Sequence, residues 1–341
     1  MKFVRNNNFN NKILIIDGQG GCGKTLFSQI CSSFKRIEIF SYAFELEFIT
    51  KLYNFKKIEK NAASTLVKML VDHKLYQNMM GREVNFRYKD LSSVFNHPYP
   101  LEYFKRIFSK GDRSIPKKIS TKKPILNLTC HDLFFYSNIL FETFGDRLVF
   151  FEIVRHPLYM VIQQHINEKE LDENVRDIQL KFLYKNKQVP YYAFDYLNQY
   201  SKANTMDRAV LAINNFTKKN NYQRNFLKNK TYKLLTIPFE KFVIYPEKYL
   251  DKMCDLLGTK FGNKTKKVLL KNRVPRKNIE DGINLEVYKR YGWKKSIMNT
   301  SFEKEKEIRI NYLKENNISQ KCLDIILDLS KKYENENIWF K

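Results

Sequence analysis

The segment from Ile13 to Cys31 constrains the fold of this chain more than any other part of the sequence. Its first residues, Ile13 to Ile16, form an apolar, β-branched run with the length of a buried parallel strand. The run leads into Gly18-Gln-Gly-Gly-Cys-Gly-Lys-Thr25, which matches the pattern G-x-x-x-x-G-K-[ST] without a mismatch. Apolar residues at helical spacing follow the loop, at Leu26, Phe27, Ile30 and Phe34. The sequence therefore predicts a buried strand, a glycine-rich loop and a helix in direct succession.

A loop of this composition is typical of a phosphate-binding site. Glycines let the backbone turn its N–H groups inward, and a helix that begins near Lys24 adds the positive end of its dipole. Lys24 would supply a mobile cation and Thr25 a hydroxyl, for a phosphate oxygen or for bound Mg²⁺. The alternative is a turn that binds nothing, and four glycines followed by Lys-Thr argue against it. The residues predicted to bind phosphate are Gly20, Gly21, Cys22, Gly23, Lys24, Thr25 and Leu26.

The net charge of +25 over 341 residues restricts the classes of partner. A nucleic-acid-binding protein usually gathers its basic residues in one arm or block, whereas the lysines here are spread along the chain. We therefore expect no nucleic-acid partner. A pocket for an anionic small molecule or an acidic substrate would benefit from the charge. A general over-use of Lys, Asn and Ile explains the charge equally well without any function.

The cysteines and the apolar runs bear on the compartment. The five cysteines are scattered and include no C-x-x-C pair, which predicts reduced thiols in a cytoplasmic protein and no metal site. The N-terminal residues are polar and lack the apolar core of a signal peptide. Since no apolar run approaches the roughly 20 residues that cross a bilayer, we also expect no membrane span. The oligomeric state is left open.

Alternating strands and helices predict the organisation of the remaining chain. Strands are expected at residues 125–129, 148–154 and 232–237, with a helix at 133–144, a largely helical stretch at 158–230 and a helix at 247–257. Residues 36–120 are interpreted as a helical insertion, and residues from about 300 to 341 as a helical C-terminal region. Within the insertion, Leu66, Met69, Leu70 and His73 share one helix face and are expected to face the core. We predict one α/β domain over residues 1–341, a three-layer α/β/α fold with a central, mostly parallel sheet.

Two basic side chains follow predicted strands. His131 comes just after the strand at 125–129, where reacting groups gather in open α/β sheets. Arg155 ends the strand at 148–154 and precedes Pro157, which suits the first turn of a helix. We interpret Arg155 as part of a second anion site. The alternatives are a histidine packed against the loop, and an arginine paired with Glu152 or Asp146.

The order of these parts resembles the sulfotransferases that use 3′-phosphoadenosine-5′-phosphosulfate (PAPS), as a soluble member of bacterial type. The loop from Gly18 to Phe27 aligns without a gap on the family's G-x-P-R-S-G-T-T-L-L, and Arg155-His-Pro157 is similar to its V-R-x-P motif. Residues 234–242, 245–247 and 256–258 resemble a strand followed by the family's Y-E-D-L, D-P and F-L-G sequences. The pair Arg276-Lys277 ahead of Gly282 is similar to the basic loop that closes on the nucleotide.

The resemblance implies a role for each of these residues. The loop would cradle the 5′-phosphosulfate, and Arg155, Arg276 and Lys277 would hold the 3′-phosphate. His131 would take the proton of the acceptor hydroxyl, and Lys24 would act with it in catalysis. Two departures concern single positions: Gln163 stands where the family has a serine, and Gly21 stands where it often has Arg or Lys. The cation has moved to Lys24, which completes a pattern that most sulfotransferases lack.

The resemblance thus implies a transferase that moves a sulfuryl group from PAPS to a hydroxyl, leaving adenosine 3′,5′-bisphosphate, with a carbohydrate or glycan as one candidate acceptor. The main alternative is an ATP- or GTP-dependent kinase or NTPase, in which Asp132 would hold Mg²⁺ for the nucleotide. That alternative has no use for Arg155 or for the segment 234–258. A third possibility is a module that binds a nucleotide or an anionic partner without turnover.

Overall fold

The computed structural model describes residues 2–173, 179–279, 282 and 300–337. A five-stranded sheet lies at its centre, with the strand order β2-β3-β1-β4-β7 and every neighbouring pair parallel. The strands are β1 (Ile13–Asp17), β2 (Ser41–Tyr42), β3 (Leu126–Thr129), β4 (Leu148–Val154) and β7 (Lys233–Pro238). A separate antiparallel hairpin is formed by β5 (Lys181–Tyr184) and β6 (Lys187–Pro190). All five residues of β1 are buried, as the apolar run predicts.

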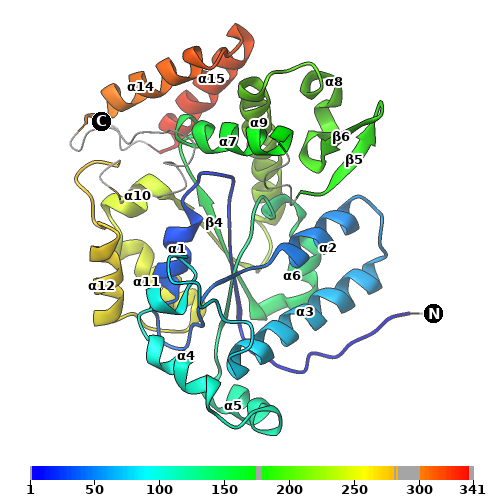
Figure 1. Cartoon of the computed structure of the whole chain (residues 1–341), viewed down its shortest axis with the longest axis vertical. Helices are drawn as coiled ribbons and strands as arrows, with labels where there is room; N and C mark the ends of the chain where they lie inside the picture. Colours follow the sequence, from blue (N-terminus) through cyan, green and yellow to red (C-terminus); the bar gives the residue numbers. More distant parts are fainter. Residues whose placement is uncertain (1, 174–178, 280–281, 283–299, 338–341) are drawn as a thin grey trace.

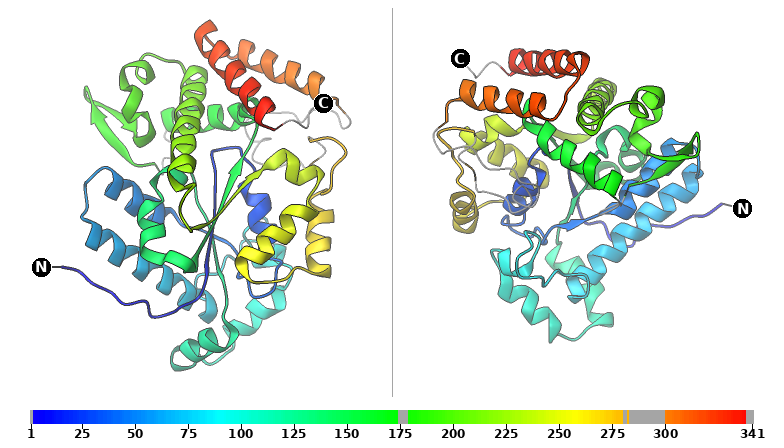
Figure 2. Two further views of the ribbon diagram at one scale, coloured as in Figure 1. Left: turned by 180° about the vertical axis from the view of Figure 1, so that it is seen from behind. Right: turned by 45° about the horizontal axis from the view of Figure 1, so that its top comes forward.

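Helices cover both faces of the sheet and give three layers (Figures 1 and 2). Ile13 and Ile15 pack into one core with α2 (Phe44–Asn54), α3 (Lys60–Met80), α5 (Ile115–Lys122) and α6 (Asn138–Phe144). Leu14 and Ile16 pack into the other core with α1 (Lys24–Cys31), α7 (Pro157–Glu173), α9 (Thr205–Leu227) and the helices that follow α9. Alternate residues of a strand point to opposite faces, so one apolar run serves both cores. The predicted three-layer α/β/α fold is confirmed.

The helices are named here by their bounds. They are α1 (Lys24–Cys31), α2 (Phe44–Asn54), α3 (Lys60–Met80), α4 (Pro100–Ile107), α5 (Ile115–Lys122), α6 (Asn138–Phe144), α7 (Pro157–Glu173), α8 (Leu197–Tyr200), α9 (Thr205–Leu227), α10 (Phe239–Ile244), α11 (Glu247–Leu257), α12 (Asn263–Lys271), α14 (Phe302–Glu315) and α15 (Gln320–Glu336). Short 3₁₀ turns include η1 (Val94–Asn96), η3 (Phe134–Tyr136) and η5 (Tyr191–Tyr196). The last two helices form an antiparallel pair against α7 and α9, at the top of Figure 1.

Long elements agree with the sequence prediction better than short ones. Strand β4 and helix α11 have the predicted bounds, and β3 and β7 begin one residue later than predicted. The expected helix at 133–144 begins as the 3₁₀ turn η3 and becomes α-helical only at Asn138. The hairpin β5–β6 was not predicted inside the helical stretch, nor was β2 inside the helical insertion. Both are short, and their pairing partners rather than their own sequences stabilise them.

Helix α3 buries a different face from the one predicted. Leu66 and Met69 are 39% and 51% exposed, and the His73 side chain is 57% exposed with Nδ1 3.7 Å from a Glu83 oxygen. The buried positions recur every fourth residue, at Ala63, Val67, Val71 and Leu75. Small and β-branched side chains let α3 pack closely on α2, α5 and α6. Of the expected core residues, Leu70 does pack against the core, whereas the expectation was wrong for Leu66, Met69 and His73. Both faces carry apolar residues, and only packing chose between them.

All five cysteines are buried free thiols, as the scattered pattern predicts. Among the described residues, no cluster of His, Cys, Asp and Glu side chains has the arrangement of a metal site. Within the same residues, none of the helices is both long and apolar enough to cross a bilayer.

Candidate functional site

The glycine-rich loop, residues 18–23, joins the carboxyl end of β1 to the first turn of α1. Gly21 and Gly23 have φ values of +82° and +91°, a conformation that L side chains rarely adopt. A Cβ on Gly23 would also lie 2.4 Å from Cε2 of Phe239, the first residue of α10. These positions therefore require glycine, and the loop lies directly against α10.

The loop presents hydrogen-bond donors that the protein itself does not use. Cys22 N–H donates to Gln19 O at 3.1 Å, which closes the loop. Within the described chain, no protein acceptor is found for the N–H groups of Gly20, Gly21 and Gly23. The amino end of α1 lies beside them and adds its positive dipole end. This arrangement can bind an anion.

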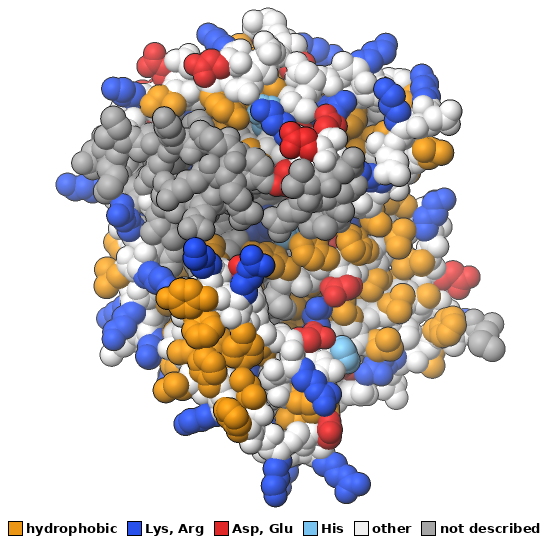
Figure 3. Space-filling view, in the orientation of Figure 1, with side chains coloured by type: hydrophobic (Ala, Val, Ile, Leu, Met, Phe, Trp, Pro, Cys, Tyr) orange, Lys and Arg blue, Asp and Glu red, His pale blue; other side chains and the backbone are white. Residues whose placement is uncertain are grey.

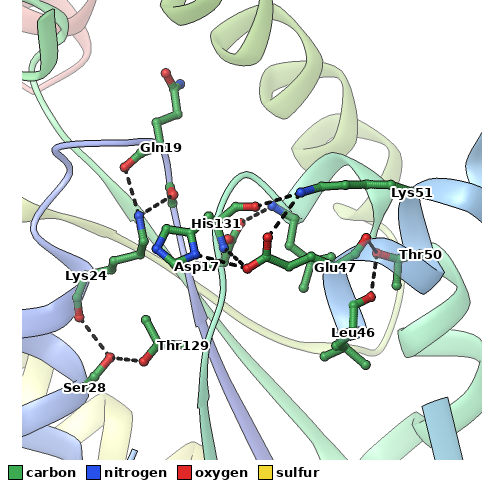
Figure 4. A network of polar contacts seen from close by, with 12 residues as sticks. Asp17, Gln19, Lys24, Ser28, Leu46, Glu47, Thr50, Lys51, Thr129 and His131 are labelled. Carbon is green, nitrogen blue, oxygen red and sulfur yellow. Dashed lines mark hydrogen bonds and ion pairs between the residues drawn. The ribbon is translucent and has the colours of Figure 1, made fainter. Parts of the chain in front are cut away.

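Lys24 is more constrained than a mobile cation. Only 6% of its surface is exposed, and Nζ donates to Gly18 O at 3.1 Å and Gln19 O at 3.3 Å (Figure 4). Burial opposes its charge, but the acidic groups around it, Cys22 and Asp132 foremost, raise the pKa of Lys24 above its usual range. The ammonium group is therefore held, charged, at the edge of the loop.

His131 lies beside this loop and is held by Glu47 of α2. Glu47 Oε1 accepts a hydrogen bond from the His131 backbone N–H at 2.8 Å and lies 3.1 Å from ring Nδ1 (Figure 4). The imidazole stacks on Phe44 and Tyr42, with ring centroids 5.4 and 5.6 Å away. Burial, followed by the charge of Lys24, lowers the pKa of His131. A neutral ring whose Nδ1–H donates to a carboxylate keeps Nε2 as a proton acceptor.

Glu47 and its partner Lys51 were not predicted from the sequence as part of the site. Glu47 Oε2 lies 3.2 Å from Lys51 Nζ, and the two side chains are only 3% and 1% exposed. Lys51 also donates to His131 O at 3.4 Å and lies 4.3 Å from the centre of the Tyr191 ring. The sequence does show Glu47 and Lys51 as an opposite-charge pair at i, i+4 in an otherwise apolar helix. Because the same spacing is common on exposed helices, it does not by itself indicate a buried site.

Two aspartates complete the acidic side of the site. Asp17, which ends β1, accepts hydrogen bonds from Leu133 N at 3.0 Å and Phe134 N at 2.8 Å, and so orients the turn after His131. Asp132 has a φ of +53°. Burial raises the pKa of Asp132 to about 7, although Lys24 opposes the shift.

This shift predicts a pH-dependent stability. Because the pKa of Asp132 rises from 3.8 to about 7 on folding, the folded state binds more protons between these values. The free energy of unfolding should therefore fall as pH rises from about 4 to about 7. In denaturant titrations, Asp132→Asn should remove this loss, and asparagine also tolerates the left-handed backbone. An equal pH slope in both proteins would contradict the assignment.

On the other side of the loop, Arg155 follows β4. Its Nη1 donates to Gly21 O at 2.8 Å, its Nε lies 3.9 Å from Glu240 Oε1, and the guanidinium carbon lies 4.4 Å from the centre of the Phe239 ring. The alternative for Arg155, an ion pair with Glu152 or Asp146, is not found in the described part of the chain. Glu152 pairs with Arg224, and Asp146 lies 3.4 Å from Lys233.

The other predicted anion contacts differ in position. Arg276 reaches the same ring, with its guanidinium carbon 5.5 Å from the Phe239 centroid, and donates to Ile279 O at 2.7 Å. Gln163 of α7 lies beside the loop, since a Cβ on Gly21 would be 3.0 Å from its own Cβ. Thr25 and Leu26 are partly buried in the first turn of α1, and Lys277 is exposed. The structure brings Arg155, Gln163 and Arg276 to the loop region, and among the described residues it gives no polar contact for Lys277.

These features define an α/β/α protein in which a glycine-rich loop, two arginines and a carboxylate-held histidine meet at the carboxyl ends of β1, β3 and β4. No family model and no curated protein matches the chain. Three solved structures that it resembles are sulfotransferases or sulfotransferase domains.

The first is the sulfotransferase domain of the Synechococcus PCC 7002 olefin synthase, with 10% identity, a TM-score of 0.41 and coverage of 98% of both chains. The second is the sulfotransferase domain of the curacin biosynthetic pathway, with 10% identity, a TM-score of 0.41 and coverage of 89% of this chain and 97% of that one. The third is sulfotransferase STF9 of Mycobacterium avium, with 9% identity, a TM-score of 0.42 and coverage of 96% of this chain and 76% of that one.

Proposed function

We propose that this protein is a sulfotransferase that moves a sulfuryl group from PAPS to a hydroxyl group of an acceptor. The observation that carries the proposal is a pair of arginines beside the loop. The guanidinium carbons of Arg155 and Arg276 lie 4.4 and 5.5 Å from the centre of the Phe239 ring. An anion site next to a phosphate loop suits a nucleotide with two separate phosphate groups. The triphosphate of Mg²⁺-ATP is one continuous chain, so it offers no separate second phosphate group for these arginines to hold.

The residues fit such a donor in charge and in hydrogen-bonding capacity. The N–H groups of Gly20, Gly21 and Gly23, with the amino end of α1, would bind the 5′-phosphosulfate. The Thr25 hydroxyl would also contribute. The N–H groups of Cys22 and Leu26 already donate to Gln19 O and Gly23 O, at 3.1 and 3.0 Å, so these two residues would shape the loop. Arg155, helped by Gln163 and Arg276, would hold the 3′-phosphate by charge-assisted hydrogen bonds. Lys277 is proposed only as an outer contact of the same phosphate.

Sulfuryl transfer, like phosphoryl transfer, mainly requires positioning and charge neutralisation. PAPS supplies an activated sulfur whose bond to the 5′-phosphate oxygen breaks as the acceptor oxygen bonds to it. His131 Nε2 would take the proton of the acceptor hydroxyl, which its neutral state permits. Lys24 would neutralise charge on the leaving phosphate, and Glu47 would hold the imidazole in place. Adenosine 3′,5′-bisphosphate would be the product.

For the acceptor we propose a hydroxyl on a carbohydrate or glycan. Tyr42 and Phe44 stack beside His131 and provide aromatic surface next to the proposed base. Aromatic faces are well suited to the apolar side of a sugar ring. The experiment that addresses this choice is an acceptor screen with sugars and with non-carbohydrate alcohols of similar size, using sulfate transfer as the readout.

The donor is tested by calorimetric titration with adenosine 3′,5′-bisphosphate and, in parallel, with ATP and Mg²⁺. We expect bisphosphate binding that needs no metal and that Arg155→Ala weakens by about 10- to 100-fold, since a hydrogen bond to a charged group contributes about 1.5–3 kcal/mol. Adenosine 5′-phosphate, which lacks the 3′-phosphate, is the matched ligand and should bind both proteins equally.

Because Arg155 also contacts the loop, its replacement needs a structural control. Arg155→Lys keeps the charge and should lose less affinity than Arg155→Ala, and the thermal midpoints of both variants should be compared with the parent protein. Tight Mg²⁺-dependent binding of ATP that ignores Arg155 would overturn the proposal and move Asp132 to the centre of a kinase mechanism. Tight bisphosphate binding without any sulfate transfer would indicate a binding module instead.

A further inference from the structure

Helix α4 and the segment before it carry an apolar surface that faces solvent. We call this surface the aromatic stripe, and its members are Tyr88, Phe95, Leu101, Phe104 and Phe108. Phe108 is 87% exposed, Tyr88 73%, Leu101 68% and Phe95 46%. Figure 3 shows apolar side chains gathered at the lower left of the molecule, in the region of α4. Monomeric proteins seldom expose a continuous apolar patch without a use for it.

The stripe is continuous rather than a set of scattered side chains. The Tyr88 and Phe95 ring centroids are 5.4 Å apart, and those of Phe95 and Phe104 are 5.7 Å apart. Leu101 and Phe104 stand at i and i+3 of α4, and Phe108, at i+7, is the C-cap residue that continues the same face. Phe104 is partly buried and joins the exposed side chains to the core residues Ile39 and Val94.

The fold of α4 does not depend on this outer face. Its inner face is anchored by Tyr103, which is 2% exposed and whose hydroxyl donates to Glu38 Oε2 at 3.2 Å. Arg106 anchors the same face, since its Nη1 donates to that Oε2 at 2.6 Å and its Nη2 donates to Glu38 Oε1 at 3.0 Å. A surface helix normally places polar residues on its outer face. Here that face carries Leu101 and Phe108 instead.

Exposed cations surround the stripe. Arg87 and Lys89 flank Tyr88, Lys105 lies within α4, and Lys110 follows Phe108. Helix α12 adds two more: Lys264 Nζ lies 5.6 Å from the centre of the Tyr99 ring, and Lys271 donates to Asn96 Oδ1 at 3.0 Å. Among the described residues, the carboxylates beside these cations include Asp90, which lies 3.5 Å from Arg87, and Glu102 of α4. The rim of the stripe is therefore positively charged.

We propose that the aromatic stripe docks on the surface of an anionic lipid bilayer. Aromatic and leucine side chains insert at the level of the headgroups, while lysines around them attract anionic lipids. A second copy of the chain is a poorer occupant, because a two-fold contact would bring two positive rims together on a protein that already carries +25. An acidic protein would need a groove whose shape matches the side chains that project from this convex helix. A lipid bilayer needs no such groove, because its lipids rearrange around the inserted side chains.

The test is co-sedimentation of the full chain with vesicles of phosphatidylglycerol and phosphatidylcholine in equal parts, and with vesicles of phosphatidylcholine alone. We expect binding to the anionic vesicles, weakened by added salt and about tenfold or more weaker for Leu101→Ser/Phe108→Ser. Lys264→Gln/Lys271→Gln should weaken binding to the anionic vesicles in the same way. The matched control is Leu183→Ser/Tyr222→Ser, a pair that is 71% and 66% exposed outside the stripe and should bind like the parent protein.

Three outcomes would overturn the proposal. The first is absence of binding to anionic vesicles, and the second is equal loss of binding in the stripe variant and the control variant. The third is a concentration-dependent dimer, measured by analytical ultracentrifugation, that Leu101→Ser/Phe108→Ser abolishes, which would assign the stripe to a second copy. Binding of polyglutamate without vesicle binding would assign it to an acidic protein. Equal thermal midpoints of all variants would confirm that the substitutions leave the fold intact.

Discussion

His131→Asn is expected to lower the turnover of sulfate transfer by about 10²- to 10⁴-fold, the usual contribution of a positioned general base. Asparagine keeps a polar side chain near Glu47 but cannot accept a proton at working pH. Binding of adenosine 3′,5′-bisphosphate should be unchanged, since the proposed phosphate contacts come from the loop and from Arg155. Steady-state kinetics with PAPS, and calorimetry of the bisphosphate, separate the two effects.

The pH profile provides an independent check on the same residue. Burial and the charge of Lys24 lower the pKa of His131 from its usual 6.5, so the imidazole should already be neutral at that pH. The value of kcat/KM should therefore rise with pH only below 6.5 and be level above it. If His131→Asn kept the acidic limb, or lost bisphosphate affinity in proportion to turnover, a structural role for His131 would be the better interpretation.

Glu47→Gln is expected to lower the free energy of unfolding by about 3–5 kcal/mol, the range for breaking a buried ion pair. Burial opposes the charge of Glu47, but Lys51 and His131 hold the pKa of its carboxyl below the usual value, so the parent protein carries a carboxylate at neutral pH. The glutamine would leave the Lys51 ammonium buried without its counter-charge. Urea unfolding at neutral pH measures the difference.

The double variant Glu47→Gln/Lys51→Met is the control for this prediction. It removes the second buried charge and should recover most of the lost stability, because an apolar side chain can fill a buried position without a counter-charge. Turnover should stay low in the double variant, since His131 would still lack the carboxylate that orients it. A double variant no more stable than Glu47→Gln would show that the ion pair was not the source of the effect.

The outcome for single elements shows why some predictions hold and others do not. The run Ile13–Ile16 is apolar at every position, so it satisfies both faces of the sheet and can hardly form anything but a buried strand. In α3 the apolar residues lie on more than one face, and packing on the neighbouring helices buries Val67 and Val71 in place of Leu66 and Met69. Periodicity identifies α3 as a helix, but it cannot rank the two apolar faces of that helix.

The candidate site likewise contains some residues that the sequence could predict and others that it could not. The loop residues, His131 and Arg155 could be predicted because each stands directly after a strand, and strand ends meet at one edge of a parallel sheet. Glu47 lies 84 positions from His131, and no local pattern connects them. The two acids considered as alternative partners of Arg155 bind Arg224 and Lys233 instead, and the acid that does lie by Arg155, Glu240, is 85 positions away in the sequence.

By itself, the sequence determined the local features of this protein: the strand, loop and helix around Gly18–Thr25, and the positions at which reactive side chains leave the sheet. These follow from backbone conformation and short-range periodicity, which neighbouring residues control. The tertiary structure alone decided which carboxylate holds His131, which acid lies by Arg155, and that the outer face of α4 is left uncovered. Those depend on contacts between segments far apart in the chain, which only the packed fold brings together.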